Sequence, residues 1–251
     1  MLKRRKRVVV WLTMQSGLKL MISALLVGLM LYMFTYELPA TNTWTNWTLP
    51  LSGKTIALDP GHGGPDGGAQ SKDGIIEKDI NLAITLHLRD YLQEAGALVV
   101  MTRENDKDLA EPSTKGYSKR KTEDMINRAQ FIIGHKSDLF VSVHLNATPS
   151  EKWSGAQTFY YPKHQQSGLL AALIQDEVKK NLKNTDRVAK PIDNFYLLKT
   201  LQIPSALVEV GFLSNPAEAG LLRSPAYQKK IAASIYQGIL RYYSGEKVGS
   251  Y

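Results

Sequence analysis

The chain has 251 residues, of which 43% are hydrophobic and 22% charged, a composition typical of a globular protein rather than a disordered one. It contains no cysteine, which excludes disulfides, thiolate metal ligands and cysteine nucleophiles. The net charge of +8 would suit nucleic-acid binding only if it lay on the folded domain. However, six of the 31 basic residues precede residue 20, and the first acidic residue is Glu37. The remaining 25 basic residues nearly balance the 23 acidic ones, so we expect no nucleic-acid partner.

A basic cluster at residues 3–7 precedes an uncharged apolar run at residues 20–36, which extends back through VVVWLTM. At 1.5 Å per helical residue, this length crosses a bilayer core of roughly 30 Å. Basic residues before the run and none directly after it predict a cytoplasmic tail and transmembrane signal anchor over residues 1–36, with the remainder outside the cytoplasm. The alternative is a cleaved signal peptide and an exported protein. Because ELPATN lacks a clear A-x-A cleavage site, we favour the anchor.

The rest of the chain is expected to form a linker and one folded domain. We predict a linker at residues 37–53, a domain at 54–243 and a tail at 244–251. Short β-branched runs alternate with segments that carry apolar residues at three- and four-residue spacing. The expected strands are 54–58, 97–101, 138–145, 156–161, 195–199 and 205–211, and the expected helices are 78–95, 122–135, 166–183 and 225–243. This alternation predicts an α/β domain, with a twisted central sheet of about six strands and helices on both faces.

Polar residues gather where the expected strands end. Open α/β sheets bind ligands at the carboxyl ends of their strands, so residues at these ends are candidates for a site. They are His62 after the first strand, Arg103 after the second, His144 and Asn146 at the end of the third, and Glu209 near the end of the last.

The stretch LDPGHGGPDGGA around His62 does not match a phosphate-binding loop. It lacks the Gly-Lys-Ser/Thr of a Walker loop, and Pro65 with the second glycine pair spoils a dinucleotide fingerprint. Glycine permits a positive φ. We therefore expect the chain to turn sharply after the strand and to leave His62 exposed.

Two histidines at neighbouring strand ends, together with a nearby acidic ligand, predict a zinc site. Neutral imidazole and carboxylate suit Zn²⁺, and a His₂Glu set leaves the fourth tetrahedral position for water. His62 and His144 are the expected histidine ligands. Glu77, at the entrance of the first helix of the domain, is the expected carboxylate, with Asp79 as its rival because that residue suits a role in the helix's first turn instead.

Glu209 is the candidate for moving protons. It lies between Val208 and Val210 on an apolar strand, and burial raises the pKa of a carboxylate. The alternative is a buried structural carboxylate paired with an arginine. Arg103 and Asn146 are candidates for holding substrate carboxylates or carbonyls or for stabilising the oxyanion. The alternatives are a surface ion pair for Arg103 and a turn for Asn146. The H-E-x-x-H motif of helical metalloproteases is absent.

Four segments, in this order, resemble the motifs of the zinc-dependent N-acetylmuramoyl-L-alanine amidases, the third amidase family of peptidoglycan hydrolases. They are LDPGHGGPDGGA, EKDINL, VSVHLNA and LVEVGFLSN. The resemblance covers about residues 54–243. It implies zinc ligands at His62, Glu77 and His144 and a catalytic glutamate at Glu209. The short chain, the single N-terminal span and the segment KWSGAQTFYY are most similar to germination-specific, spore-cortex amidases of endospore-forming bacteria.

The resemblance implies hydrolysis of the amide between the lactyl group of N-acetylmuramic acid and L-alanine of the stem peptide. In the spore branch this reaction would serve cortex maturation, as a step towards muramic lactam, and germination. The expected partners are peptidoglycan glycan strands with stem peptides, the membrane through the N-terminal helix, and an activating protein that loads zinc or opens the groove. Two alternatives are a catalytically silent peptidoglycan-binding scaffold and a metallopeptidase that cleaves within the stem peptide.

Overall fold

The computed structural model describes residues 13–35 and 49–247. The basic cluster at residues 3–7, most of the predicted linker and residues 248–251 lie outside the described residues. The chain divides into two compact units, Met1–Trp47 and Thr48–Tyr251.

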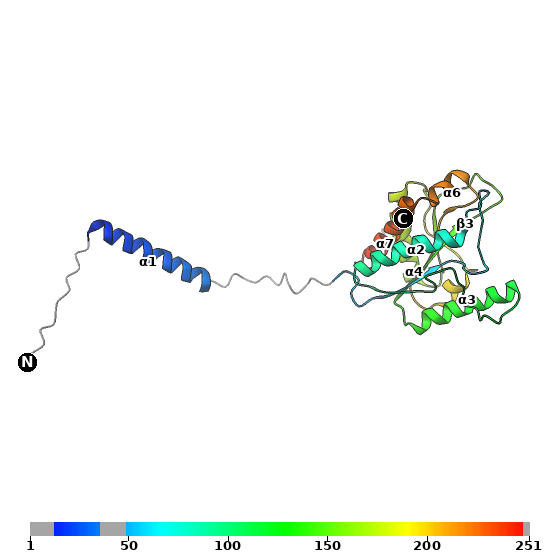
Figure 1. Ribbon diagram of the computed structural model, residues 1–251, viewed down its shortest axis with the longest axis horizontal. Helices are drawn as coiled ribbons and strands as arrows, with labels where there is room; N and C mark the ends of the chain where they lie inside the picture. The colour runs from blue at the N-terminus through cyan, green and yellow to red at the C-terminus, as the bar shows by residue number, and fades with distance from the viewer. Residues whose placement is uncertain (1–12, 36–48, 248–251) are drawn as a thin grey trace, which may run out of the picture. The chain divides into compact units, whose positions relative to one another are not determined.

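In the first unit, helix α1 runs over Met14–Thr35 (Figure 1). Its mean hydropathy reaches 1.9, and none of its side chains is buried. At 1.5 Å per residue the helix is roughly 33 Å long, which matches the thickness of a bilayer core. Among the described residues it is the one helix long and apolar enough to cross a membrane, a description that an anchor and a signal sequence share.

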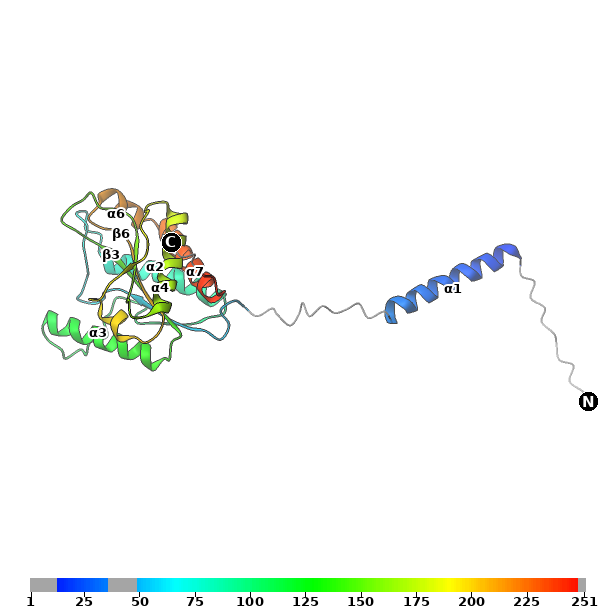
Figure 2. The same cartoon turned by 180° about the vertical axis from the view of Figure 1, so that it is seen from behind.

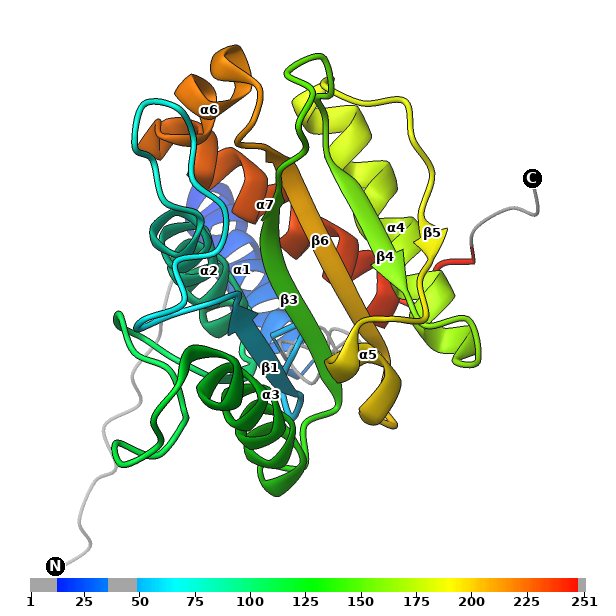
Figure 3. The ribbon, with the colours of Figure 1, turned by 90° about the vertical axis from the view of Figure 1, so that its right-hand side faces the viewer.

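In the second unit, the central sheet has six strands in the order β2-β1-β3-β6-β4-β5. Figure 3 shows β1, β3, β6, β4 and β5 side by side in this order. They are β1 (Thr55–Pro60), β2 (Leu98–Met101), β3 (Leu139–Asn146), β4 (Gln157–Tyr160), β5 (Lys190–Pro191) and β6 (Ser205–Phe212). Strands β2, β1, β3 and β6 are parallel to one another, whereas β4 is antiparallel to β6. The carboxyl ends of the four parallel strands therefore meet at one edge of the sheet.

Helices cover both faces of this sheet (Figures 1 and 2). They are α2 (Glu77–Glu94), α3 (Tyr117–Gly134), α4 (Gln165–Leu182), α5 (Tyr196–Thr200), α6 (Pro216–Leu222) and α7 (Pro225–Tyr243). Apolar side chains of α2, α4 and α7 pack in one core cluster and those of α3 and α5 in another. The predicted α/β domain with a sheet of about six strands and helices on both faces is confirmed.

The two core clusters follow from the alternation of side chains along the strands. Successive residues of a strand point to opposite faces of the sheet. On β1, Leu58 belongs to the cluster under α2, α4 and α7, and the preceding Ala57 to the cluster under α3 and α5. On β3, Val141 and Phe140 divide in the same way, and all four side chains are fully buried. Because both faces are covered, apolar side chains are needed at every one of these positions.

The strand expected at 195–199 is wrong, because the chain forms the short helix α5 there. Leu197, Leu198 and Leu201 are buried in the cluster with α3, and a short apolar run of this kind fits a helix or a strand equally well. The sixth strand is instead the exposed edge strand Lys190–Pro191, and an edge is where a sheet tolerates proline. The sequence also missed α6, and α3 begins five residues before its expected start at residue 122.

Close packing of α7 against α4 depends on Gly238. A Cβ at this position would lie 2.6 Å from the Cα of Ile174, whereas a Cβ at Gly220 in α6 would meet no atom within 4 Å. We expect Gly238→Ala to lower the free energy of unfolding by about 1–3 kcal/mol through overpacking. Gly220→Ala is the matched control, and its better helix propensity is expected to leave stability unchanged or raise it by up to about 1 kcal/mol. Urea unfolding followed by circular dichroism measures both, and an equal loss in the two variants would contradict this packing.

Candidate metal centre

The loop after β1 positions His62. This residue has a φ of 65°, in the left-handed region that side chains rarely adopt. A Cβ at Gly61 would overlap the His144 ring, and one at Gly68 would lie 2.5 Å from Glu77 Oε2. The glycines are therefore needed because other side chains approach the loop closely. The expectation that they leave His62 exposed is wrong, because its side chain is 16% exposed.

Three side chains converge at the carboxyl edge of the sheet. Glu77 Oε1 lies 3.2 Å from His62 Nε2 and 3.1 Å from His144 Nδ1. One potential ligand atom from each residue lies within 4.8 Å of the other two. Glu77 is the first residue of α2, and His144 lies near the end of β3. Asp79, the rival carboxylate, is exposed and is not part of this group.

The charges of this group are strongly coupled. Burial opposes the charged form of His62, but hydrogen bonds to Asp66 and Glu77 outweigh it and raise the pKa of His62 to about 9. Burial alone would raise the pKa of Glu77, but hydrogen bonds from His144 and His62 hold that pKa well below its usual range. Glu77 also accepts hydrogen bonds from the backbone N–H groups of Ala69 and Leu145, at 2.8 and 2.9 Å. The carboxylate is therefore ionised and fixed in position.

Glu209 lies on β6 directly beside His144 of β3 in the strand register. Its Oε2 is inaccessible to solvent and has no hydrogen-bond partner among the described residues. Burial raises the pKa of Glu209 to about 7, with the charge of Glu77 adding to the effect and the two histidines opposing it. A carboxyl group with this pKa can both accept and release a proton near neutral pH. The arginine partner that a structural carboxylate would need is absent from the contacts of Glu209 in the described part of the chain.

The donor set fits a divalent zinc ion. Two imidazoles and one carboxylate form a set that leaves a fourth position for water in catalytic zinc sites. Asp66 Oδ2 lies 2.9 Å from His62 Nδ1, and a carboxylate behind a histidine ligand is a common means of orienting the ring. Asp66 is a residue that sequence reasoning missed, although it stands four residues after His62 in the same glycine-rich segment.

Arg103, expected to contact substrate, lies under the loop instead. Its side chain is buried, and its three guanidinium nitrogens donate to backbone carbonyls, including those of Pro60, Gly61 and Lys78, at 2.8–2.9 Å. These bonds support the loop and the start of α2. The structure therefore contradicts a substrate contact for Arg103, because a buried guanidinium with these partners is not free to hold a ligand.

Arg128 of α3 is a second buried arginine under the loop, and sequence reasoning missed it. It donates to Asp59 Oδ1 at 2.6 Å, to Asp124 Oδ2 at 2.9 Å and to the carbonyl of His62 at 2.6 Å. Burial alone would raise the pKa of Asp59, but Arg128 and neighbouring hydroxyls lower it to about 2. An arginine four residues after an aspartate in an amphipathic helix is typical of a surface pair. The sequence therefore contains no signal that Arg128 is buried.

Asn146 ends β3, where its carbonyl accepts a hydrogen bond from Leu213 N–H at 2.8 Å. Its side chain is half-buried and makes no hydrogen bond to another described residue. A role of Asn146 in holding substrate stays a prediction.

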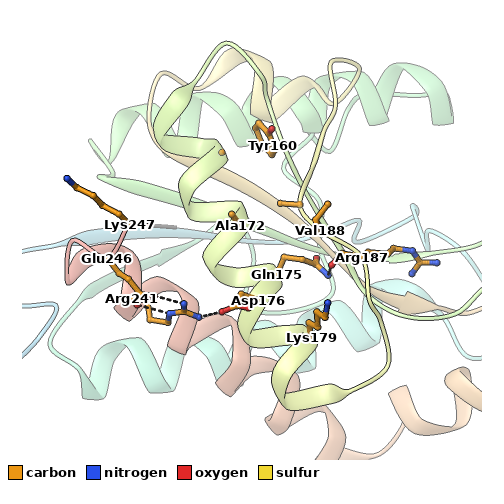
Figure 4. A pocket seen from close by; sticks show the side chains of 12 residues that line it. Tyr160, Ala172, Gln175, Asp176, Lys179, Arg187, Val188, Arg241, Glu246 and Lys247 are labelled. Atoms are coloured by element: carbon orange, nitrogen blue, oxygen red, sulfur yellow. Dashed lines mark hydrogen bonds and ion pairs between the residues drawn. The ribbon is translucent and has the colours of Figure 1, made fainter. Parts of the chain in front are cut away.

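A separate cavity of about 410 Å³ lies beside α4 and the C-terminal end of α7 (Figure 4). Within its lining, Arg241 pairs with Asp176 and Glu246. None of the site residues that the sequence predicts lines this cavity.

Comparison with known proteins identifies the family. The pattern of the N-acetylmuramoyl-L-alanine amidase family matches residues 56–241, which include the three converging side chains and Glu209. The chain belongs to this family.

Within the family, the chain is 55% identical over 216 residues to the germination-specific N-acetylmuramoyl-L-alanine amidase of Bacillus subtilis, covering 86% of this chain and 91% of that protein. It is also similar to the CwlD amidase of Clostridioides difficile, whose structure is known in complex with the GerS lipoprotein. That match has a TM-score of 0.75 and 47% identity, and covers 77% of this chain and all of that one. An N-acetylmuramoyl-L-alanine amidase of Clostridium difficile 630 matches with a TM-score of 0.68 and 31% identity, over 77% of this chain and 98% of that one.

The pair formed by Asp59 and Arg128 gives a test of how the loop is supported. Both side chains are about 1% exposed. We expect Arg128→Leu to lower the free energy of unfolding by about 3–5 kcal/mol, because Asp59 is left as a buried unpaired charge. Adding Asp59→Asn is expected to recover part of this loss. Arg89→Leu, which removes a surface ion pair with Glu104, is the control and is expected to cost at most about 1 kcal/mol. Additive losses in the double variant would contradict a coupled pair.

Proposed function

We propose that the chain is a zinc-dependent N-acetylmuramoyl-L-alanine amidase that hydrolyses the amide between the lactyl group of muramic acid and L-alanine. The observation that carries this proposal is the convergence of His62, Glu77 and His144 beside a carboxyl group, Glu209, whose pKa is raised to about 7. Family membership supports the same bond specificity.

The three residues His62, Glu77 and His144 would hold the ion. Bound there, Zn²⁺ would polarise the amide carbonyl and lower the pKa of a bound water towards roughly 7. Glu209 takes a proton from the attacking water and returns it to the leaving amine of L-alanine. A pKa near neutrality suits this exchange, because the same group must accept the proton and then release it. Asp66 keeps the His62 ring oriented throughout.

We further propose that the amidase acts in the maturation of the spore cortex and in germination. Similarity to the germination-specific amidase of Bacillus subtilis supports this role. α1 serves as the membrane anchor in this proposal, and the domain that follows it acts on the cell wall outside the cytoplasm. α1 has the length and hydropathy of a membrane span, and wall hydrolysis requires an extracytoplasmic domain.

A protein partner is part of the proposal. The related amidase of Clostridioides difficile forms a complex with a lipoprotein. A partner of this chain would assist zinc loading or access to the groove. Help with loading is in line with the contacts of Glu77 with His62 and His144, because zinc must replace these contacts when it binds.

Product analysis on purified muropeptides tests the reaction. Wild-type protein with zinc is expected to release stem peptides with new L-alanine amino termini and to leave peptide-free glycan. Glu209→Gln is expected to retain zinc and to lose turnover by about 10²–10⁴-fold, because it cannot move the proton. Cleavage between two amino acids would indicate a peptidase, and the absence of cleavage by wild-type protein a binding scaffold. An active Glu209→Gln variant would show that another group is the base.

Bound zinc, measured by metal analysis and chelator competition, tests the ligand set. His62→Ala and His144→Ala are expected to lose the ion. Gly68→Ala is a sharper test, since its Cβ would displace Glu77, and we expect affinity to fall by roughly 10–100-fold. Gly74→Ala is the matched control, because Gly74 also has a positive φ, at 82°, but its Cβ would meet nothing closer than 3.9 Å. Equal affinities in the two glycine variants would contradict the assigned geometry.

The raised pKa of Glu209 predicts a dependence of stability on pH in metal-free protein. The unfolded carboxyl group ionises near 4.5 and the folded one near 7, so the folded state binds the proton more tightly. The free energy of unfolding contributed by this group therefore falls as the pH rises from 4.5 to 7 and stays low above that range. Glu209→Gln removes the effect, and its stability relative to wild type should rise by on the order of 3 kcal/mol between pH 5 and 8. Urea unfolding with a chelator measures this, with exposed Glu94→Gln as the control, and a constant difference would contradict a buried carboxyl group.

A further inference from the structure

A groove of about 490 Å³ lies between α3 and α5, which are neighbours in the fold (Figures 2 and 3). Its walls include Tyr117, Lys121, Met125 and Ile126 of α3 and Tyr196 of α5. Tyr117, Ile126 and Tyr196 are 57%, 39% and 43% exposed, so two aromatic rings and an aliphatic side chain are open to solvent at one place.

The groove adjoins the metal centre through both of its helices. On the α3 side, Tyr117 Oη donates to Asp66 Oδ1 at 2.8 Å, and Lys121 Nζ lies 3.0 Å from Asp66 Oδ2. Asp66 in turn holds His62. On the α5 side, the ring of Phe195, next to Tyr196 in the chain, packs edge-on against His144 with centroids 5.7 Å apart. A polymer bound at the metal centre could therefore continue into this groove.

The side chains that line the groove suit the sugar rings of such a substrate better than its stem peptide. Lys121 is the one charged residue that lines the groove, and Asp66 already neutralises it. The groove thus offers no free charge to the carboxylates of a stem peptide. Tyrosine presents an apolar ring with a polar tip, which suits the apolar C–H face and the hydroxyl groups of a sugar ring. The hydroxyls of Ser118 and Thr122 add polar groups along the same wall.

We propose that this groove is the subsite for the glycan strand, and that it binds neutral N-acetylhexosamine rings next to the muramic acid whose amide is cleaved. The proposal rests on the proposed amidase function for the identity of the polymer. Tyr196 and Ile126 then determine affinity for long strands, while the scissile amide is held elsewhere.

Binding to metal-free, full-length protein in detergent tests the proposal independently of activity. The probe is an uncharged oligosaccharide of four N-acetylglucosamine units, titrated by calorimetry, with a free stem peptide as the second probe. We expect the oligosaccharide to bind and Tyr196→Ala and Ile126→Ala to weaken it, by about tenfold for the aromatic residue. Ile133→Ala is the matched control, because Ile133 is 57% exposed on the same helix and lies outside the groove. No binding of the oligosaccharide, or an equal effect of Ile133→Ala, would overturn the proposal, as would stem-peptide binding that Tyr196→Ala weakens.

Enzyme kinetics with the zinc-loaded protein test the glycan subsite and the amidase function separately. On long glycan strands, Tyr196→Ala is expected to raise KM by about tenfold with kcat unchanged, because uniform binding is lost. Cleavage of a single muramoyl peptide should not change. If wild-type protein cleaves the amide but the groove variants match it in both assays, the subsite is wrong and the amidase stands. If the groove binds sugar as expected but no amide is cleaved, the amidase function fails and the glycan site stands.

Discussion

Two buried arginines hold the loop on which the candidate metal centre depends. Arg103 donates to the carbonyls of Pro60 and Gly61, and Arg128 donates to that of His62. Between β1 and α2 this loop forms no helix or strand, and the only bridges within its own backbone are the isolated ones between Gly63 and Asp66 and between Gln70 and Ile76. Because its carbonyls are tied down from below, His62 can be kept in a left-handed conformation that would otherwise cost free energy. Asp59, at the end of β1, supplies the charge that keeps Arg128 buried.

The positions of the other site residues depend on the loop that the two arginines hold. With the loop fixed, the missing side chains of Gly61 and Gly68 leave the space that His144 and Glu77 occupy. Glu77 is joined to the loop through Ala69 N–H and to β3 through Leu145 N–H, so a single carboxylate links three elements. Glu209 comes from the next strand, where burial raises the pKa of its carboxyl group to about 7. The site thus combines a rigid set of donors with one group able to move a proton.

Much of this arrangement could be predicted from the sequence. Helices at 78–95, 166–183 and 225–243 are observed to within one residue, because their apolar spacing is long and regular. The grouping of His62 and His144 follows from the rule that ligands bind at the carboxyl ends of parallel strands, and Glu77 is the carboxylate that begins the helix nearby. The two buried arginines that support the loop could not be predicted. Arg103 and Arg128 look like surface residues in the sequence, and their burial results from contacts with residues 25–69 positions away. The helix at 196–200 depends likewise on packing against α3.

In the proposed site, the loop presents His62 so that three side chains can bind one ion while Glu209 stays free. Anomalous X-ray diffraction at the zinc edge, from crystals of the zinc-loaded protein, tests this arrangement directly. We expect one strong peak at about 2.0–2.2 Å from a nitrogen of His62, a nitrogen of His144 and an oxygen of Glu77, with Glu209 outside bonding distance. A zinc ion bound directly by Glu209, or held without His62, would contradict the ligand set of His62, Glu77 and His144.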